Sequence, residues 1–118
     1  MITVYNRNKE DHSNNPNNYK IFRPNILGNP YTDIKDKSTL ASFIVSSREE
    51  AIEKYSEYFD IMYSSNIQFK NLVDEIYQKY KNGEDIFFEC YCAPKPCHGN
   101  VIADKLRRRL IKEKIRSK

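Results

Sequence analysis

Three stretches of the chain repeat apolar residues at the spacing of an amphipathic helix. The first follows the capping-box pair Ser47 and Glu50, the second is expected from about Gln68 to Gly83, and the third from about Cys97 to Ile115. Because each set falls on one side of its helix, we expect three helices that face one core. The apolar positions are Ala51, Ile52, Tyr55, Phe59 and Met62; Phe69, Leu72, Val73, Ile76 and Tyr80; and Val101, Ile102, Leu106, Leu110 and Ile115.

Short β-branched and aromatic runs predict strands at Ile2–Tyr5 and Tyr19–Phe22, and Leu40–Val45 fits either a short strand or a packed loop. The strongest run, Asp85–Tyr91, has three consecutive apolar residues, which is typical of a central parallel strand buried on both faces. Strand, helices, strand and helix in this order predict one small α/β domain over residues 1–118, with a short, partly parallel sheet.

Composition and charge narrow the class of protein. Hydrophobic residues make up 39% of the chain, enough for one core. No run reaches the roughly 18 apolar residues of a membrane span, and the beginning has no signal-peptide pattern, so we expect a cytoplasmic protein without a membrane partner. The net charge of +4 comes from the stretch after residue 103, which holds eight Lys or Arg and two acidic residues. We expect this stretch to be a solvated helix face with at most weak contact to nucleic acid.

The chemistry of the chain is concentrated in Cys90, Cys92 and Cys97, which are followed directly by His98 and Gly99. This segment joins the carboxyl end of the predicted central strand to the last helix, where open α/β sheets bind ligands and where free N–H groups suit a phosphate. Three interpretations stay open: a zinc site, a catalytic thiolate at Cys97 assisted by His98, and a ligand-binding loop whose cysteines mainly pack. The donor spacing differs from that of structural zinc sites, so we predict no metal and no cofactor.

A second group of candidates surrounds Arg23 and the turn that contains Gly28 and Asn29. A guanidinium beside backbone amides suits bidentate phosphate recognition. The alternative is that Arg23 bonds loop carbonyls and that Asn29 shapes the turn. Arg48 is a further candidate ligand contact, although its place in the first turn of a helix favours the surface, and His12 is expected to be solvated.

Several of these segments together resemble a known family. Arg23-Pro24, Leu27–Pro30, Arg48–Ile52 and Cys90–Gly99 follow one another as in the domain of unknown function family 4326, small proteins common in phages and bacteria. The Cys-rich end is also similar to the domain of unknown function family 488. The resemblance implies a Rossmann-like, three-layer fold of the nucleotide-binding sort and brings no established reaction. The Thr32–Ser46 segment is longer than the family's usual spacer, and the basic end lies outside the pattern.

We therefore expect a protein that binds a phosphorylated, nucleotide-type small molecule. The family context implies a phage protein that sequesters a nucleotide signal of host immunity in the host cytoplasm. One alternative is a Cys-dependent hydrolase or transferase of nucleotide sugars, with Cys97 as nucleophile and His98 as acid–base; another is a zinc-stabilised module that binds nucleic acid or protein. Whether the chain is an enzyme, and its oligomeric state, stay open. The expected ligand-binding residues are Arg23, Gly28, Asn29, Cys90, Cys92, Cys97, His98 and Gly99.

Overall fold

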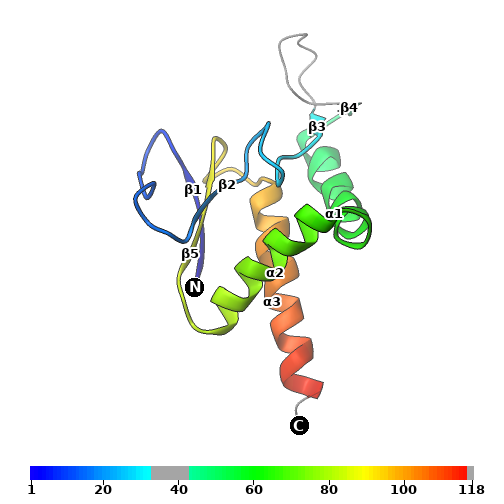
Figure 1. Cartoon of the computed structure of the whole chain (residues 1–118). Coiled ribbons are helices and arrows are strands. Elements are labelled where there is room, and N and C mark those ends of the chain that lie inside the picture. Colours follow the sequence, from blue (N-terminus) through cyan, green and yellow to red (C-terminus); the bar gives the residue numbers. More distant parts are fainter. Residues whose placement is uncertain (33–42, 117–118) are drawn as a thin grey trace.

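The computed structural model describes residues 1–32 and 43–116, and it confirms an α/β fold with three helices and a small parallel sheet (Figure 1). The expectation for Leu40–Val45 falls only partly on described residues, where a short strand is found. The elements in chain order are β1 (Ile2–Asn6), β2 (Asn18–Lys20), β3 (Tyr31–Thr32), β4 (Phe43–Ile44), α1 (Arg48–Ser65), α2 (Ile67–Lys81), β5 (Ile86–Cys90) and α3 (His98–Arg116).

The main sheet has the order β1-β5-β2, and both outer strands run parallel to β5. The central position of β5 agrees with its apolar sequence, since Ile86, Phe88 and Cys90 are buried in the core. β2 begins and ends earlier than the sequence predicts, but Ile21 extends the pairing by donating its N–H to the Glu89 carbonyl at 3.1 Å. β3 and β4 form a separate parallel pair.

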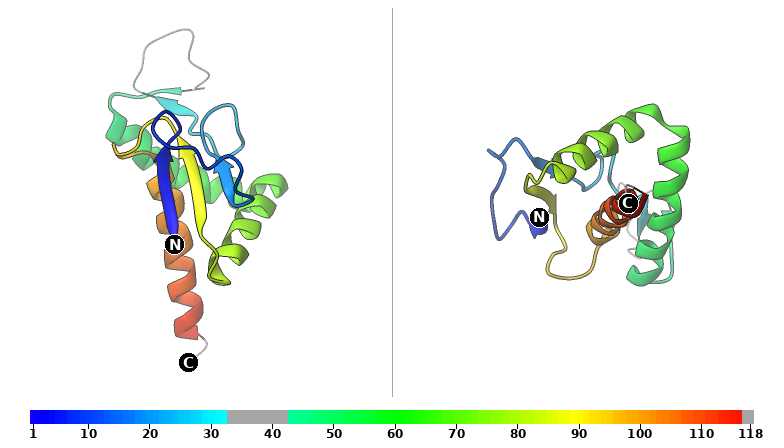
Figure 2. Two further views of the ribbon diagram at one scale, coloured as in Figure 1. Left: turned by 90° about the vertical axis from the view of Figure 1, so that its left-hand side faces the viewer. Right: turned by 90° about the horizontal axis from the view of Figure 1, so that it is seen from below.

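The two faces of the main sheet are covered differently. All three helices lie on one side of it (Figure 2), whereas the loop between β1 and β2 passes over the other side. On that side His12 stacks on Phe87, with ring centroids 4.4 Å apart, and meets the edge of Tyr5 at 4.7 Å. The expectation that His12 is merely solvated is therefore wrong, because its ring covers part of the sheet. A Rossmann-like arrangement of the layers stays a prediction.

The helix boundaries follow from side chains that cap them. Ser47 accepts the N–H of Glu50 at 3.1 Å and so begins α1, as predicted, although the Glu50 carboxylate returns to Ser46 and not to Ser47. Asn66 ends α1 and begins α2, where its side chain accepts the N–H of Phe69 at 3.0 Å. Gly83 follows α2 with a φ of 87°, the left-handed conformation expected of it.

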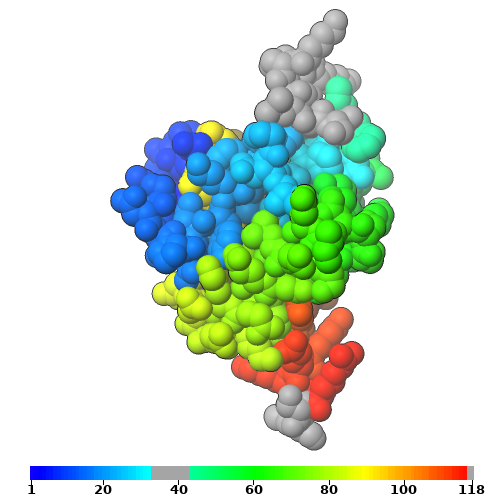
Figure 3. All heavy atoms as spheres, in the orientation of Figure 1, coloured from blue at the N-terminus to red at the C-terminus, as the bar shows by residue number. Residues whose placement is uncertain are grey.

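The predicted apolar positions of α3 reach the core as far as Leu110. Ile102 and Leu106 are buried, but Ile115 is 69% exposed, so its expected place in the core is wrong. The reason is visible in Figure 3, where the last turns of α3 project beyond the rest of the molecule. No helix within residues 1–32 and 43–116 combines the length and the apolar character needed to cross a bilayer.

Candidate functional site

A pocket of about 160 Å³ opens where β5 ends and α3 begins. Six of the eight predicted ligand-binding residues line it, and only Gly28 and Gly99 do not. We call it the arginine–cysteine pocket. Its walls are Phe22, Arg23, Asn29, Tyr31, Thr32, Arg48, Ala51, Ile52, Cys90, Tyr91, Cys92, Pro96, Cys97 and His98.

The two remaining glycines serve packing. A Cβ atom on Gly99 would lie 2.7 Å from Ile21 Cδ1 and 2.9 Å from Val4 Cγ1, so this glycine lets α3 approach the sheet closely. A Cβ atom on Gly28 would lie 2.9 Å from the Asn25 carbonyl oxygen, inside the turn after β2. Both glycines therefore shape the frame that supports the pocket.

Arg23 and Asn29 are partly engaged in holding the pocket wall. Arg23 Nη1 donates to the Asn29 carbonyl at 2.6 Å and to the Tyr31 carbonyl at 3.4 Å. The Asn29 side chain donates to the Ala51 carbonyl at 3.1 Å and ties the turn to α1. This agrees with the alternative in which Arg23 bonds loop carbonyls. Within the described part of the chain both Arg23 bonds start from Nη1, which leaves Nη2 and Nε for a ligand.

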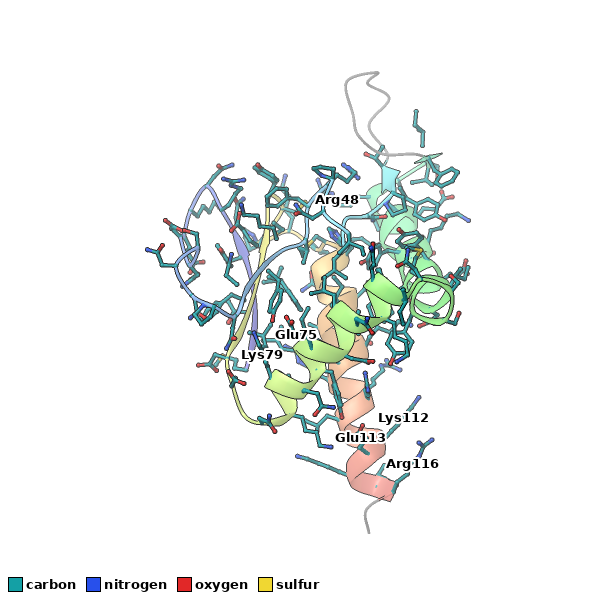
Figure 4. All side chains as sticks on the ribbon, viewed as in Figure 1. Arg48, Glu75, Lys79, Lys112, Glu113 and Arg116 are labelled. Atoms are coloured by element: carbon teal, nitrogen blue, oxygen red, sulfur yellow. The ribbon has the colours of Figure 1, made fainter. Side chains whose placement is uncertain are left out.

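Arg48 also lines the pocket, where the sequence favours a surface role for it. It shares the pocket wall with Cys92, and its positive charge helps the Cys97 thiol to lower the pKa of Cys92. Figure 4 shows Arg48 near the end of the molecule where β5 ends, far from the free end of α3. None of the described residues that line the pocket is Asp or Glu, so its two arginines have no carboxylate beside them there. The sequence signal for Arg48 is its presence in the segment Arg48–Ile52 that carries the family resemblance.

The three thiols converge in the pocket wall and form no disulfide. All three thiols line the pocket. Cys90 and Cys97 are 1% and 4% exposed, whereas Cys92 is half-buried. The Cys97 thiol lowers the pKa of Cys90 and of Cys92 to about 6 each, and at Cys92 the positive charges of Arg48 and Arg23 act in the same direction. The pKa of Cys97 itself is raised, because its proton is held by the neighbouring sulfurs.

Cys97 is at the same time the cap of α3. Its sulfur accepts the N–H of Gly99 at 3.4 Å, and its own N–H donates to Asn100 Oδ1 at 3.0 Å. This reciprocal pair is a capping box with a thiol in the place of the usual hydroxyl. The acidified thiol that a catalytic Cys97 would need is not found there, because the pKa is lowered at Cys90 and Cys92 and raised at Cys97. The cap also occupies the N–H of Gly99 that the sequence offers to an anion.

His98 is buried at the start of α3. Its Nε2 lies 2.6 Å from the Ile21 carbonyl, to which it donates, and burial lowers the pKa of the ring to about 4. The neighbouring Tyr55 hydroxyl donates to the Leu27 carbonyl at 2.7 Å, and the two rings have centroids 4.8 Å apart. These bonds tie α3 and α1 to the segment after β2. The geometry gives His98 a positioning role, whereas the acid–base role stays a prediction.

No group of three or more His, Cys, Asp or Glu side chains in residues 1–32 and 43–116 is arranged to hold a metal ion. His98, the nitrogen donor of the segment, is committed to a backbone carbonyl. The zinc alternative therefore draws no support from this part of the chain.

Comparison with known proteins gives one match. The model of a family described as a domain of unknown function, DUF4326, matches residues 4–108. The match runs from β1 into α3 and includes every residue that lines the arginine–cysteine pocket, while the last turns of α3 lie outside it. Neither the curated proteins nor the solved structures give a match.

Proposed function

This chain belongs to the DUF4326 family, and we propose that it binds a phosphorylated small molecule of the nucleotide type in the arginine–cysteine pocket. The observation that carries the proposal is that Arg23 and Arg48 both line a pocket whose described walls hold no carboxylate. Half-buried guanidinium groups without a carboxylate partner favour an anion that can accept several N–H groups at once. The position at the carboxyl end of a central parallel strand supports the same function.

The size of the pocket suggests which part of the ligand enters it. A volume of about 160 Å³ is well below the roughly 300–1,000 Å³ of pockets that enclose whole drug-sized ligands. We therefore infer that the pocket takes a phosphate with part of its sugar and leaves the base at the rim. Tyr91, 51% exposed, lies at that rim and meets Phe22 edge to face at 4.9 Å, so it offers an aromatic surface for a base.

Calorimetric titration with nucleoside mono- and diphosphates, cyclic nucleotides and nucleotide sugars tests the proposal. Arg48→Gln and Arg23→Lys should each weaken binding, since each removes a charge-assisted or bidentate contact. The expected loss for Arg48→Gln is about 1.5–3 kcal/mol, roughly a 10- to 150-fold rise in Kd. The matched control is Arg108→Gln, a residue of α3 whose side chain is 72% exposed and lies outside this pocket. Failure of wild type to bind any of these ligands, or equal losses in Arg48→Gln and Arg108→Gln, would contradict the proposal.

A more specific form of the proposal is that the protein acts in a host cytoplasm and sequesters a nucleotide signal of phage defence. Its support is the resemblance to a family common in phages. Sequestration requires that a bound nucleotide be recovered unchanged after the complex is denatured by heat. Chromatography of the released ligand is the measurement, and a converted product would favour the hydrolase or transferase alternative.

One observation favours that enzyme alternative enough to keep it as the second candidate. Cys92 combines a lowered pKa with an accessible place in the wall of the pocket, whereas Cys90, whose pKa is also lowered to about 6, is 1% exposed. In this form of the alternative Cys92, not Cys97, is the nucleophile, and His98 positions α3. Conversion of a nucleotide sugar by wild type but not by Cys92→Ser would establish it.

A further inference from the structure

The three thiols of the arginine–cysteine pocket differ in access and in hydrogen bonding, and this difference points to a chemistry that nucleotide binding does not use. We propose that Cys92 and Cys97 are a reactive thiol pair, in which Cys92 is oxidised by a hydroperoxide and Cys97 then closes a disulfide with it. The site is a modification site, and its co-reactant is hydrogen peroxide or a small organic hydroperoxide.

Cys92 is the member of the group that a small oxidant can reach. It lies in the loop between β5 and α3, is half-buried and lines the pocket, whereas Cys90 is 1% and Cys97 4% exposed. Arg48 lines the same pocket. A guanidinium beside a sulfur stabilises the thiolate, which is the form that attacks peroxides.

Cys97 is placed to complete the reaction. It lines the same pocket as Cys92 and is the largest influence that lowers the pKa of Cys92, and its backbone N–H donates to Asn100 Oδ1 at 3.0 Å. Burial protects Cys97 from direct attack by the oxidant. A partner that is already adjacent and held on a helix terminus favours disulfide formation over further oxidation of Cys92.

Cys90 differs from Cys92 in access. It is the last residue of β5 and contributes to the pocket wall, but it is 1% exposed, and its sulfur accepts the N–H of Ala93 at 3.4 Å. The pKa of Cys90 is lowered to about 6, as is that of Cys92, so access and not the pKa distinguishes the two thiols.

The reaction balances in two steps. The Cys92 thiolate attacks one oxygen of the hydroperoxide, so that an S–O bond forms and the O–O bond breaks; the leaving alkoxide or hydroxide takes a proton and departs as alcohol or water. The sulfur of Cys97 then attacks Cys92 Sγ, the S–S bond forms and the S–O bond breaks. The departing hydroxide takes the proton of Cys97 and leaves as water. The thiol pair loses two electrons, and the peroxide gains them.

The test is oxidation of the reduced protein by equimolar hydrogen peroxide, read by intact mass and by peptide mapping. Wild type should lose the mass of two hydrogens and yield a Cys92–Cys97 linkage. Cys97→Ser should stop at a sulfenic acid on Cys92, which dimedone traps, and Cys92→Ser should lose the rapid reaction. The matched control is Cys90→Ala, which should still form the Cys92–Cys97 linkage. The readout is a mass, so it does not depend on whether the pocket binds a nucleotide.

A second measurement on wild type alone keeps the test independent of how the variants fold. Iodoacetamide should modify Cys92 first, with a rate that rises through a midpoint near pH 6, and Arg48→Gln should shift this midpoint upward. A Cys90–Cys97 linkage, first alkylation at Cys90 or Cys97, or a midpoint at the value of a free thiol, near pH 8.5, would overturn the proposal.

Discussion

At the scale of single residues, the charge on Cys92 decides how the pocket meets an anion. Above its pKa of about 6 the Cys92 thiolate neutralises Arg48 and repels a phosphate. Cys92→Ser should therefore strengthen binding of a nucleoside monophosphate at pH 8, severalfold by Coulomb interaction across a pocket that is partly open to water. Near pH 5, where the thiol is neutral, the substitution should have little effect. Calorimetry at both pH values measures this; an equal effect at the two would contradict it.

The free energy of unfolding should depend on pH through the ionisation of His98. Its folded-state pKa, about 4, lies below the value of 6.5 for an exposed histidine, so the unfolded chain binds a proton more readily. Stability from the neutral ring is thus complete above pH 6.5 and is lost as the pH falls toward 4. The loss amounts to about 3 kcal/mol at most.

Urea unfolding between pH 7 and pH 4 measures this effect. Wild type should lose more stability over this window than His98→Gln, whose amide can still donate to the Ile21 carbonyl. Carboxylates titrate in the same window in both proteins, so the difference between them isolates the ring. Parallel curves for wild type and His98→Gln would show that His98 does not titrate in this way.

At the scale of elements, the helices and the central strand could be predicted from the sequence, because the spacing of their apolar residues determines which side of each is buried. The start of α1 at Ser47 and the end of α2 before Gly83 follow from local capping chemistry and were also predicted. The sequence did not predict that the Cys97 thiol caps α3, because a sulfur is a rare substitute for a hydroxyl. The end of β2 at Lys20 was missed too, since pairing with β5 decides it and not local propensity.

The candidate site likewise has residues that the sequence predicts and residues whose place depends on long-range packing. Its cysteines and Arg23 stand out in the sequence because their chemistry is unusual for a small chain. The position of Arg48 depends on how closely the start of α1 approaches the loop after β5, a long-range packing that periodicity does not contain. The lowered pKa values of Cys90 and Cys92 depend likewise on where the folded chain places the three thiols.

Two neighbouring arginines of α3 differ in their contacts: Arg109 packs against α2, whereas Arg108 is exposed and serves as its control. Arg109 donates to Asp74 at 2.9 Å and lies over the ring of Tyr77, 3.9 Å from its centroid. Among the described residues Arg108 pairs with Asp104 of the same helix, and both side chains are more than half exposed. Arg109→Ala should therefore cost about 1–2 kcal/mol of stability, through the lost charge-assisted bond and cation–π contact.

Arg108→Ala should change the free energy of unfolding by less than about 0.5 kcal/mol, as for most exposed positions. Urea denaturation of both variants is the measurement. Equal effects would mean that α3 is not held against α2 through Asp74.

At the scale of the whole molecule, the pocket and the basic end of α3 are separated. The molecule measures 49 × 31 × 24 Å, and Figure 4 shows Arg48 at one end with Lys112 and Arg116 at the other. A groove of basic character runs along α3 at that second end. It is lined by Phe59, Asp60, Tyr63, Val73, Lys105, Leu106, Arg108, Arg109, Lys112, Glu113 and Arg116. Because the pocket and the basic end of α3 lie so far apart, a substitution in one should leave the other unchanged.

This separation predicts the effect of deleting residues 112–118. The deletion removes four basic residues and one acidic residue, and it leaves intact the buried half of α3 and the region matched by the family model. It breaks the ion pairs of Glu113 with Lys81 at 2.9 Å and with Arg109 at 3.9 Å. All three side chains are roughly a third exposed or more, so stability should fall by only about 0–1 kcal/mol. Alkylation of Cys92 should be unchanged, because the pocket lies at the other end.

Binding to duplex DNA, by contrast, should weaken in the shortened chain. We propose that this contact is weak, without sequence preference and dominated by phosphates, so its affinity falls steeply as salt rises. Fewer lysines and arginines release fewer counterions, and the slope of log affinity against log salt should therefore become shallower in the deletion variant. Fluorescence anisotropy across a salt series measures both slopes. Unchanged slopes would show that residues 112–118 do not touch DNA, whereas a shallower slope together with slower alkylation of Cys92 would mean that the two ends of the molecule are not independent.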